Sequence, residues 1–226
     1  MVIGRAIDGS FIFTKEGLVG KWDKWILLII SCIIFPLFIG YTMRIYRGAK
    51  STPALDDWGG MFIDGIKLLV VGVIYALPVL FLEFVLMGST TIAMLSSASG
   101  APYMDPGAFI GLLAAIFFGA TVVVIVSIIL GLITATASVR FARTNSFGEA
   151  FNFGAIFAQI CKIGWMIYII ALIMMSIISG IVALIVATIT MINIYIGIVL
   201  FLILLPVIGL FSARYLTILY ESTGPA

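Results

Sequence analysis

Long apolar stretches constrain this chain more than any other feature of its sequence. A helix that spans a bilayer needs about 20 predominantly apolar residues. Five stretches meet that need, at residues 25–46, 66–87, 108–138, 163–190 and 192–216. Hydrophobic residues make up 63% of the chain and charged residues only 10%, whereas about a quarter of a soluble domain is charged. The sequence therefore predicts an all-α, polytopic transmembrane helical bundle of about five spans.

The segments between the apolar runs differ in kind. Residues 1–24, 47–65 and 141–162 mix charged with apolar side chains, which is typical of amphipathic helices at the membrane surface. Residues 88–107 are rich in Ser, Thr, Gly and Pro and predict a loop between the second and third spans. A short turn at residues 191–193 is expected to join the last two spans. The whole chain is interpreted as one integral membrane domain.

The cationic residues indicate an orientation, because cytoplasmic loops of membrane proteins are enriched in Lys and Arg. If the spans alternate, eight of the twelve cationic residues follow spans one, three and five and share one side. They are Arg44, Arg47, Lys50, Lys67, Arg140, Arg143, Lys162 and Arg214. This charged side is expected to face the cytoplasm, in a multi-pass protein of the cell membrane.

The N-terminal segment conflicts with that orientation. The other four cationic residues are Arg5, Lys15, Lys21 and Lys24. Five alternating spans would place them on the opposite side. Either residues 1–24 cross the membrane despite their charge, or one apolar run is a re-entrant hairpin. Pro36 with Gly40 makes the first run the most prone to break. Five spans is the favoured interpretation, with the re-entrant first run as the alternative.

An internal repeat is visible in the sequence. Residues 58–67 align with residues 153–162 at an offset of 95 positions, with aromatic, small, apolar, Phe and Lys positions in common. Upstream, the pair Arg44-x-x-Arg47 matches Arg140-x-x-Arg143. Such self-similarity indicates that one structural unit occurs twice.

The repeat predicts two parallel copies of a span, a surface helix and a return span. The first copy covers residues 25–107 and the second covers residues 108–190, while residues 191–226 form the last span and the tail. Cationic residues at the ends of the spans suit the negative end of a helix dipole and can reach lipid phosphates. The candidate residues for this cytoplasmic, lipid-headgroup face are Arg44, Arg47, Trp58, Lys67, Arg140, Arg143, Lys162 and Arg214.

Two further groups of polar residues are candidates for function. Glu83 is the one ionisable residue well inside an apolar run, where an uncompensated charge costs roughly 2.5–3.5 kcal/mol or more. It is either a proton- or cation-relay group or an interfacial residue near the loop. Asp56, Asp57 and Asp64 form an interfacial motif with Trp58, in which the first two suit the first turn of a helix beginning near Pro53.

The composition argues against catalysis. The chain has no histidine, the commonest general base and metal ligand. Its two cysteines, Cys32 and Cys161, are too far apart in sequence to suggest a metal site or a disulfide framework. We therefore expect no catalytic residue, no cofactor and no metal. A net charge of +2 is too small to indicate a nucleic-acid partner.

Several motifs resemble those of a known family. They are Gly40-Tyr41-x-x-Arg44, Leu55-Asp56-Asp57-Trp58-Gly59-x-x-Phe62-x-Asp64-Gly65-x-Lys67, Tyr75-Ala76-Leu77-Pro78, Arg140-Phe141-Ala142-x-Thr144 and Phe147-x-Glu149-Ala150-Phe151. Together they are similar to the archaeal and bacterial membrane proteins grouped as domain of unknown function 4013. That resemblance implies a multi-pass membrane protein, and it supplies no catalytic residues.

Two kinds of function fit these features. The favoured one is a non-enzymatic scaffold, accessory subunit or lipid-interacting module, whose expected partners are membrane lipids, other membrane proteins or further copies of itself. The alternative is a small transporter or channel component that uses Glu83 in the second span.

Overall fold

The computed structural model describes residues 2–98 and 106–224, and this part of the chain contains nine α-helices and no β-strand. In order they are α1 (Val2–Leu18), α2 (Trp22–Ile33), α3 (Phe35–Tyr46), α4 (Trp58–Ala98), α5 (Pro106–Thr144), α6 (Phe147–Ala150), α7 (Phe153–Ile163), α8 (Trp165–Ile192) and α9 (Ile194–Glu221). The predicted all-α fold is confirmed.

Four helices are long and apolar enough to cross a bilayer. They are α4, α5, α8 and α9, and the bent pair of α2 and α3 makes a fifth if it counts as one span. The second and third apolar runs lie within α4 and α5, and the fourth and fifth lie within α8 and α9 except for their first two residues. The prediction of a polytopic helical membrane protein is therefore confirmed.

The turn between the last two spans is a single residue. α8 ends at Ile192 and α9 begins at Ile194, so Asn193 alone joins them. The Asn193 Oδ1 atom accepts hydrogen bonds from the backbone N–H groups of Tyr195 and Ile196, at 3.0 and 3.1 Å. This N-cap satisfies two donors that have no partner within the helix, and it fixes the tight hairpin expected at residues 191–193.

The first apolar run is broken. α2 and α3 differ in direction by 120°. Pro36 lies in the first turn of α3, where it has no N–H to continue the helical hydrogen bonds of α2. Ile34 leaves the helical conformation between the two helices, with φ −91° and ψ 76°. The break lies where the re-entrant alternative requires one.

The predicted loop at residues 88–107 is mostly helical instead. α4 continues to Ala98 and α5 begins at Pro106, while residues 99–105 lie outside the described part of the chain. Three of the hydroxyl-bearing residues that suggested a loop, Ser89, Thr90 and Thr91, are satisfied inside the helix. The Thr91 Oγ1 atom, for example, donates to the carbonyl oxygen of Met87 at 2.7 Å. Hydroxyl groups that bond to a carbonyl one turn earlier are compatible with a helix.

The helix expected near Pro53 begins later and extends further. It starts at Trp58, directly after Asp57, and continues through the second span as the single helix α4. In the second copy of the repeat the surface helix α7 is separate, because Gly164 interrupts the chain before α8 with a φ of 93°. A positive φ suits glycine, which has no Cβ.

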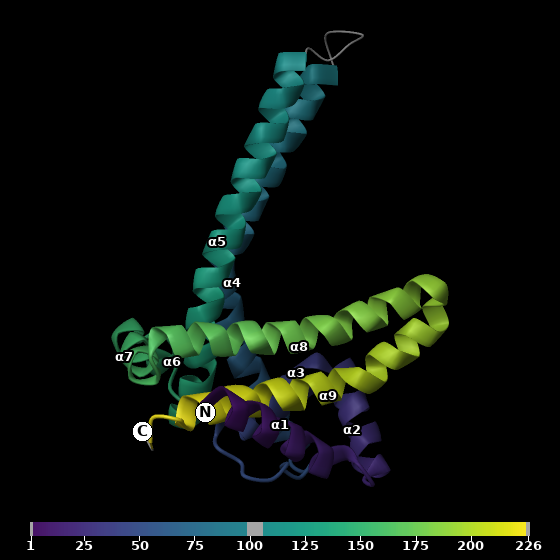
Figure 1. Cartoon of the computed structure of the whole chain (residues 1–226), viewed down its shortest axis with the longest axis vertical. Helices are drawn as coiled ribbons and strands as arrows, with labels where there is room; N and C mark the ends of the chain where they lie inside the picture. The colour runs from purple at the N-terminus through teal and green to yellow at the C-terminus, as the bar shows by residue number, and fades with distance from the viewer. Residues whose placement is uncertain (1, 99–105, 225–226) are drawn as a thin grey trace. The chain divides into compact units, whose positions relative to one another are not determined.

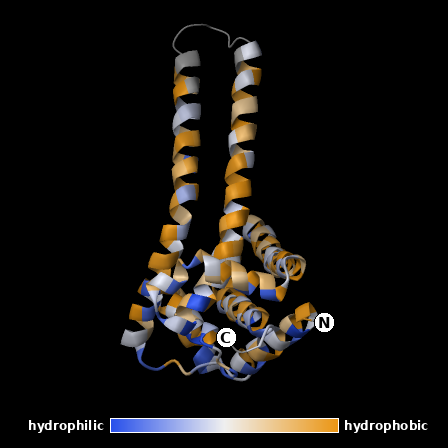
Figure 2. Ribbon diagram, turned by 90° about the vertical axis from the view of Figure 1, so that its left-hand side faces the viewer, coloured by the Kyte–Doolittle hydropathy of each residue, from blue (hydrophilic) through white to orange (hydrophobic). Residues whose placement is uncertain are grey.

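The helices divide into two compact units, of which the smaller covers residues 73–134. Within it, α4 and α5 run antiparallel as a hairpin whose two helices are apolar along most of their length (Figures 1 and 2). Gly119 of α5 lies against the side chain of Leu86 of α4. Phe84 and Phe117 are 77% and 78% exposed. Outward-facing aromatic residues of this kind suit a surface that lies in lipid.

The larger unit contains residues 1–72 and 135–226 and is organised around α9. α9 packs against α1, α2, α3, α7 and α8. One buried cluster of its core consists of side chains from five of the helices. It comprises Phe13, Leu18, Leu28, Leu37, Tyr41, Ile45, Met61, Leu210 and Ala213.

The N-terminal segment packs on this unit as helix α1. One face of the helix, with Ala6, Phe13 and Leu18, is buried. The other face carries the exposed charged residues Arg5 and Lys15 together with the exposed apolar residues Phe11 and Ile12.

α3 and α4 make a close backbone contact in the larger unit. Gly40 lies against the backbone of Met61, and Gly65 lies against the backbone of Pro36. A Cβ atom at either glycine would overlap a carbonyl oxygen of the facing helix. The two glycines therefore let the backbones touch, as small residues do at membrane helix interfaces.

Candidate functional site

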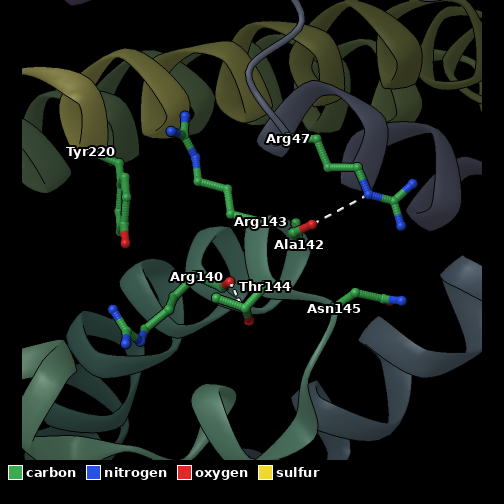
Figure 3. Close-up of a pocket in the computed structure, with 7 residues that line it drawn as sticks. All are labelled: Arg47, Arg140, Ala142, Arg143, Thr144, Asn145 and Tyr220. Carbon is green, nitrogen blue, oxygen red and sulfur yellow. Dashed lines mark hydrogen bonds between the residues drawn. The ribbon is translucent and has the colours of Figure 1, made fainter. Parts of the chain in front are cut away.

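The ends of α3 and α5 exchange equivalent hydrogen bonds. The Arg47 Nε–H donates to the carbonyl oxygen of Ala142, and the Arg143 Nε–H donates to the carbonyl oxygen of Tyr46, both at 3.2 Å (Figure 3 shows the first). Each arginine thus bonds to the residue that precedes the other. The last carbonyls of a helix have no partner within it, so each arginine satisfies an end of the opposite helix.

The same two arginines form ion pairs. Arg47 lies 2.7 Å from a carboxylate oxygen of Asp64, and Arg143 lies 2.5 Å from one of Glu221. The Arg143 guanidinium also stacks 5.1 Å from the ring centre of Tyr220. Asp64 lies three residues before Lys67, but among the described residues its ion pair is with Arg47.

Arg44 and Arg140, the first arginines of the two motifs, each form an ion pair with a carboxylate in the same copy of the repeat. Arg44 lies 2.7 Å from Asp56 and 3.7 Å from Asp57. Arg140 donates to Glu149 through both Nε and Nη2, with the Nε contact at 2.8 Å. This hydrogen bond lowers the pKa of the Glu149 carboxyl below its ordinary value. Glu149 is therefore held in its charged form.

α9 completes the cluster. The Arg214 Nη1 atom donates to the carbonyl oxygen of Ala49 at 2.9 Å, and its guanidinium lies 5.3 Å from the ring centre of Phe13. The Thr217 hydroxyl, three residues later, donates to the carbonyl oxygen of Ala213 at 2.7 Å and also lies 3.3 Å from the carbonyl oxygen of Ile45. Thr217 follows Arg214 by three residues, as Arg47 follows Arg44 and Arg143 follows Arg140. We call the five arginines at positions 44, 47, 140, 143 and 214 the arginine cluster.

A pocket of about 780 Å³ opens beside this cluster. The residues that line it are Arg47, Arg140, Ala142, Arg143, Thr144, Asn145 and Tyr220 (Figure 3). Three guanidinium groups at one pocket favour anions, but each of the three is already paired with a carboxylate. The arrangement is therefore close to charge-balanced before any ligand arrives.

The structure brings together most, but not all, of the predicted residues. Lys67 is half-buried, Lys162 is exposed, and neither takes part in an ion pair among the described residues. Trp58 packs against the core. Glu83 belongs to the smaller unit, is exposed, and forms no ion pair within the described part of the chain.

The two copies of the repeat cap their surface helices at equivalent positions. Asp57 caps α4 by accepting a hydrogen bond from Gly60 N–H, and Asn152 caps α7 by accepting one from Ala155 N–H, both at 3.1 Å. These positions are again 95 residues apart. Asn152 was not singled out in the sequence, although extending the aligned segment by one residue would have found it.

Three further residues of the site were also missed. Glu149 and Glu221 supply carboxylates to Arg140 and Arg143. Buried Gln159 donates from Nε2 to the carbonyl oxygen of Tyr220 at 2.9 Å, at the end of α9. Gln159 is the repeat equivalent of Asp64, which gives a sequence signal for it. Glu221 lies beyond the repeat and has no such signal.

The two caps make a paired prediction. Asp57→Ala and Asn152→Ala should each lower the free energy of unfolding by about 1 kcal/mol, because each leaves an N-terminal N–H without its acceptor. The measurement is thermal unfolding in detergent, followed by circular dichroism. Asp57→Asn and Asn152→Asp keep a capping oxygen and are expected to retain most of the stability. If the alanine variants lose no more stability than Asp57→Asn and Asn152→Asp, the capping hydrogen bonds do not stabilise the protein.

Four of the helices are long and apolar enough to cross a bilayer, and arginine side chains join helix ends by hydrogen bonds. These features define the class of protein, which is a multi-pass helical membrane protein. The family model for protein of unknown function (DUF4013) matches residues 25–213, and the chain belongs to this family. The family resemblance inferred from the motifs is thus confirmed. No curated protein and no solved structure matches the chain.

Proposed function

We propose that this protein is a non-enzymatic membrane scaffold, whose charged residues join the ends of its helices rather than act on a substrate. The observation that carries the proposal is the reciprocal exchange between Arg47 and Arg143, with the ion pairs around it. The side chains that would bind or process a substrate are here hydrogen-bonded to the chain itself.

The placement of the acidic residues supports a scaffold over a transporter. A relay carboxylate has to exchange protons or cations with water inside the membrane. Asp64, Glu149 and Glu221 are held by arginines at the helix ends. Glu83, the residue of the transport alternative, is exposed on its hairpin and has no ionic partner among the described residues.

We also propose that the first apolar run is re-entrant. Residues 1–24 then lie on the same side of the membrane as the other charged segments, and that side faces the cytoplasm. Two contacts support it. The Lys24 Nζ atom donates to Thr52 Oγ1 at 2.8 Å, and Arg214 stacks on Phe13. Both join the N-terminal segment to the charged side. All twelve cationic residues then satisfy the positive-inside rule.

One labelling experiment tests both parts of the proposal. Single cysteines are placed in a Cys32→Ala, Cys161→Ala background and treated with a membrane-impermeant maleimide from either side. We expect no reactive positions through residues 72–87 and 165–185, because lipid and packed helices exclude the aqueous reagent. Glu16→Cys and Ser51→Cys are expected to react from the same side.

Two results would contradict the proposal. A helical stripe of reactive positions around residue 83 would indicate a water-filled path and favour a transporter. Labelling of Glu16→Cys and Ser51→Cys from opposite sides would restore five alternating spans. Ser146→Cys, at an exposed position, is the positive control for the reagent. Purification of a stable complex with another membrane protein would add direct support for a scaffold.

A further inference from the structure

α7 is an apolar helix that is too short to cross a bilayer. It has 11 residues, Phe153–Ile163, whereas a span needs about 20. Gly164 alone separates it from α8, and the φ of 93° at this glycine turns the chain, so that α7 runs across the end of α8 (Figure 1). Because α8 begins at Trp165, α7 lies level with the end of this span.

The first copy of the repeat lacks a separate helix of this kind. Leu69 stands where the second copy has Gly164, and the surface helix continues into the span without a break as α4. Trp58, the repeat equivalent of Phe153, packs against the core. The glycine of the second copy therefore separates α7 from its span and gives it a direction of its own.

One face of α7 is fixed against the rest of the larger unit. Ile156, Gln159, Ile160 and Ile163 are buried, and α7 contacts both α8 and α9. The hydrogen bond from Gln159 to the carbonyl oxygen of Tyr220 lies on this buried face. The rotation of α7 about its own axis is therefore set by the chain itself, and so is the direction in which its other residues point.

The two sides of this buried face differ in kind. At 3.6 residues per turn, Phe153 and Phe157 lie about 40° apart on one side, and Lys162 lies about 140° from Phe157 on the other. Phe153 and Phe157 are 48% and 39% exposed. Lys162 is exposed and forms no ion pair in the described part of the chain. Such a separation suits a helix with the bilayer on one side and water on the other.

The phenylalanine side of α7 is continuous with the exposed apolar surface of α8. The ring centres of Phe157 and Trp165, the first residue of α8, are 5.9 Å apart. From Trp165 this exposed surface continues along α8 through Met166, Ile169 and Ile173. Because α8 is long and apolar enough to cross a bilayer, its exposed apolar side chains lie in lipid. The same lipid then contacts the phenylalanine side of α7.

We propose that α7 binds the lipid surface as an interfacial helix, with Phe153 and Phe157 in the outer part of the acyl region and the Lys162 ammonium at the phosphates. Helices of this kind insert their apolar side about 5–10 Å into the boundary between headgroups and acyl chains. Trp165 is then at the depth that tryptophan prefers in membrane proteins. The inference goes beyond the scaffold role and does not depend on it, because it concerns only contacts with lipid.

Spin labels on the full chain test the proposal. Single cysteines in a Cys32→Ala, Cys161→Ala background carry a nitroxide, and the protein is placed in vesicles of phosphatidylcholine and phosphatidylglycerol. Electron paramagnetic resonance compares collisions of the label with oxygen, which concentrates in the acyl region, and with a water-soluble nickel complex. Collisions with oxygen should dominate for Phe153→Cys and Phe157→Cys, whereas collisions with nickel should dominate for Lys162→Cys.

Two positions outside α7 calibrate the measurement. Ile173→Cys, on the exposed apolar side of α8, gives the oxygen-to-nickel ratio of lipid, and Ser146→Cys, at an exposed polar position, gives that of water. Labelling the native Cys161 avoids any substitution in α7, since this cysteine is exposed and only Cys32 has to be replaced. Cys161 lies between Phe157 and Lys162 around the helix, so its ratio should lie between theirs.

Three results would overturn the proposal. A ratio at Phe157→Cys equal to that of water would place the phenylalanine side outside the bilayer. A label at Phe157→Cys that is shielded from both oxygen and nickel would show that protein, rather than lipid, covers this side. Equal ratios at Phe157→Cys, Cys161 and Lys162→Cys would mean that α7 has no side directed toward the bilayer.

Discussion

Gly65→Ala is expected to lower the free energy of unfolding by about 3 kcal/mol, the upper part of the usual range for overpacking. The added Cβ would overlap the carbonyl oxygen of Pro36 on the facing helix. A backbone atom has no rotamer by which to move away, so α3 and α4 must separate. Gly40→Ala makes the mirror-image clash, with the carbonyl oxygen of Met61, and should cost a similar amount.

The loss should extend beyond the glycine contact. Arg44 reaches Asp56, and Arg47 reaches Asp64, only while α3 and the start of α4 keep their present spacing. The Tyr41 hydroxyl donates to the carbonyl oxygen of Pro53 at 3.1 Å across the same connection. Separating the helices lengthens all three contacts at once.

Gly72→Ala is the matched control for this prediction. Gly72 lies in the same helix as Gly65, two turns further on, and apart from the local backbone of α4 no atom lies within 4 Å of where its Cβ would be. Alanine is a better helix former than glycine by about 1 kcal/mol, so this variant should be neutral or slightly more stable. Thermal unfolding in detergent compares the two. Equal melting temperatures for Gly65→Ala and Gly72→Ala would show that the close contact is not required.

The sequence predicts the apolar helices of this protein well and their ends poorly. The spans follow from hydrocarbon thickness alone, which a count of apolar residues captures. The ends depend on hydrogen bonds that composition does not reveal. Ser89 and Thr91 suggested a loop, yet both hydroxyls bond to carbonyls within α4. Asp57 was placed inside a first turn, whereas it is the residue immediately before the helix.

The candidate site was predicted as a set of residues but not as a set of partners. The repeat indicated Arg44, Arg47, Arg140 and Arg143 because they recur at nearly the same spacing. Which carboxylate each arginine meets depends on tertiary packing. Asp64 is three residues from Lys67, a spacing that allows a local ion pair on a helix. It instead pairs with Arg47, because the Gly40–Gly65 contact brings the end of α3 to that point.

Arg143→Ala is expected to lower the free energy of unfolding by about 2–3 kcal/mol, the range for hydrogen bonds that involve a charged group. The substitution removes the donor to Tyr46 and the ion pair with Glu221 together, and leaves that carboxylate without its partner. Arg47→Ala should cost about 2 kcal/mol for the same reason, through Ala142 and Asp64. Lys162→Ala, at an exposed cation without an ion pair in the described part of the chain, is the control and should be nearly neutral.

The double variant Arg47→Ala, Arg143→Ala distinguishes a coupled exchange from two separate contacts. Arg47 follows Tyr46 directly in the chain, so losing the Arg143 bond to Tyr46 releases the segment that holds Arg47 against Ala142. The double variant should therefore lose about 1 kcal/mol less than the two single variants added together. Strict additivity would mean that the two bonds act independently. Arg143→Lys sharpens the test, since one ammonium cannot reproduce the separate Nε and Nη2 donors that reach Tyr46 and Glu221 at once.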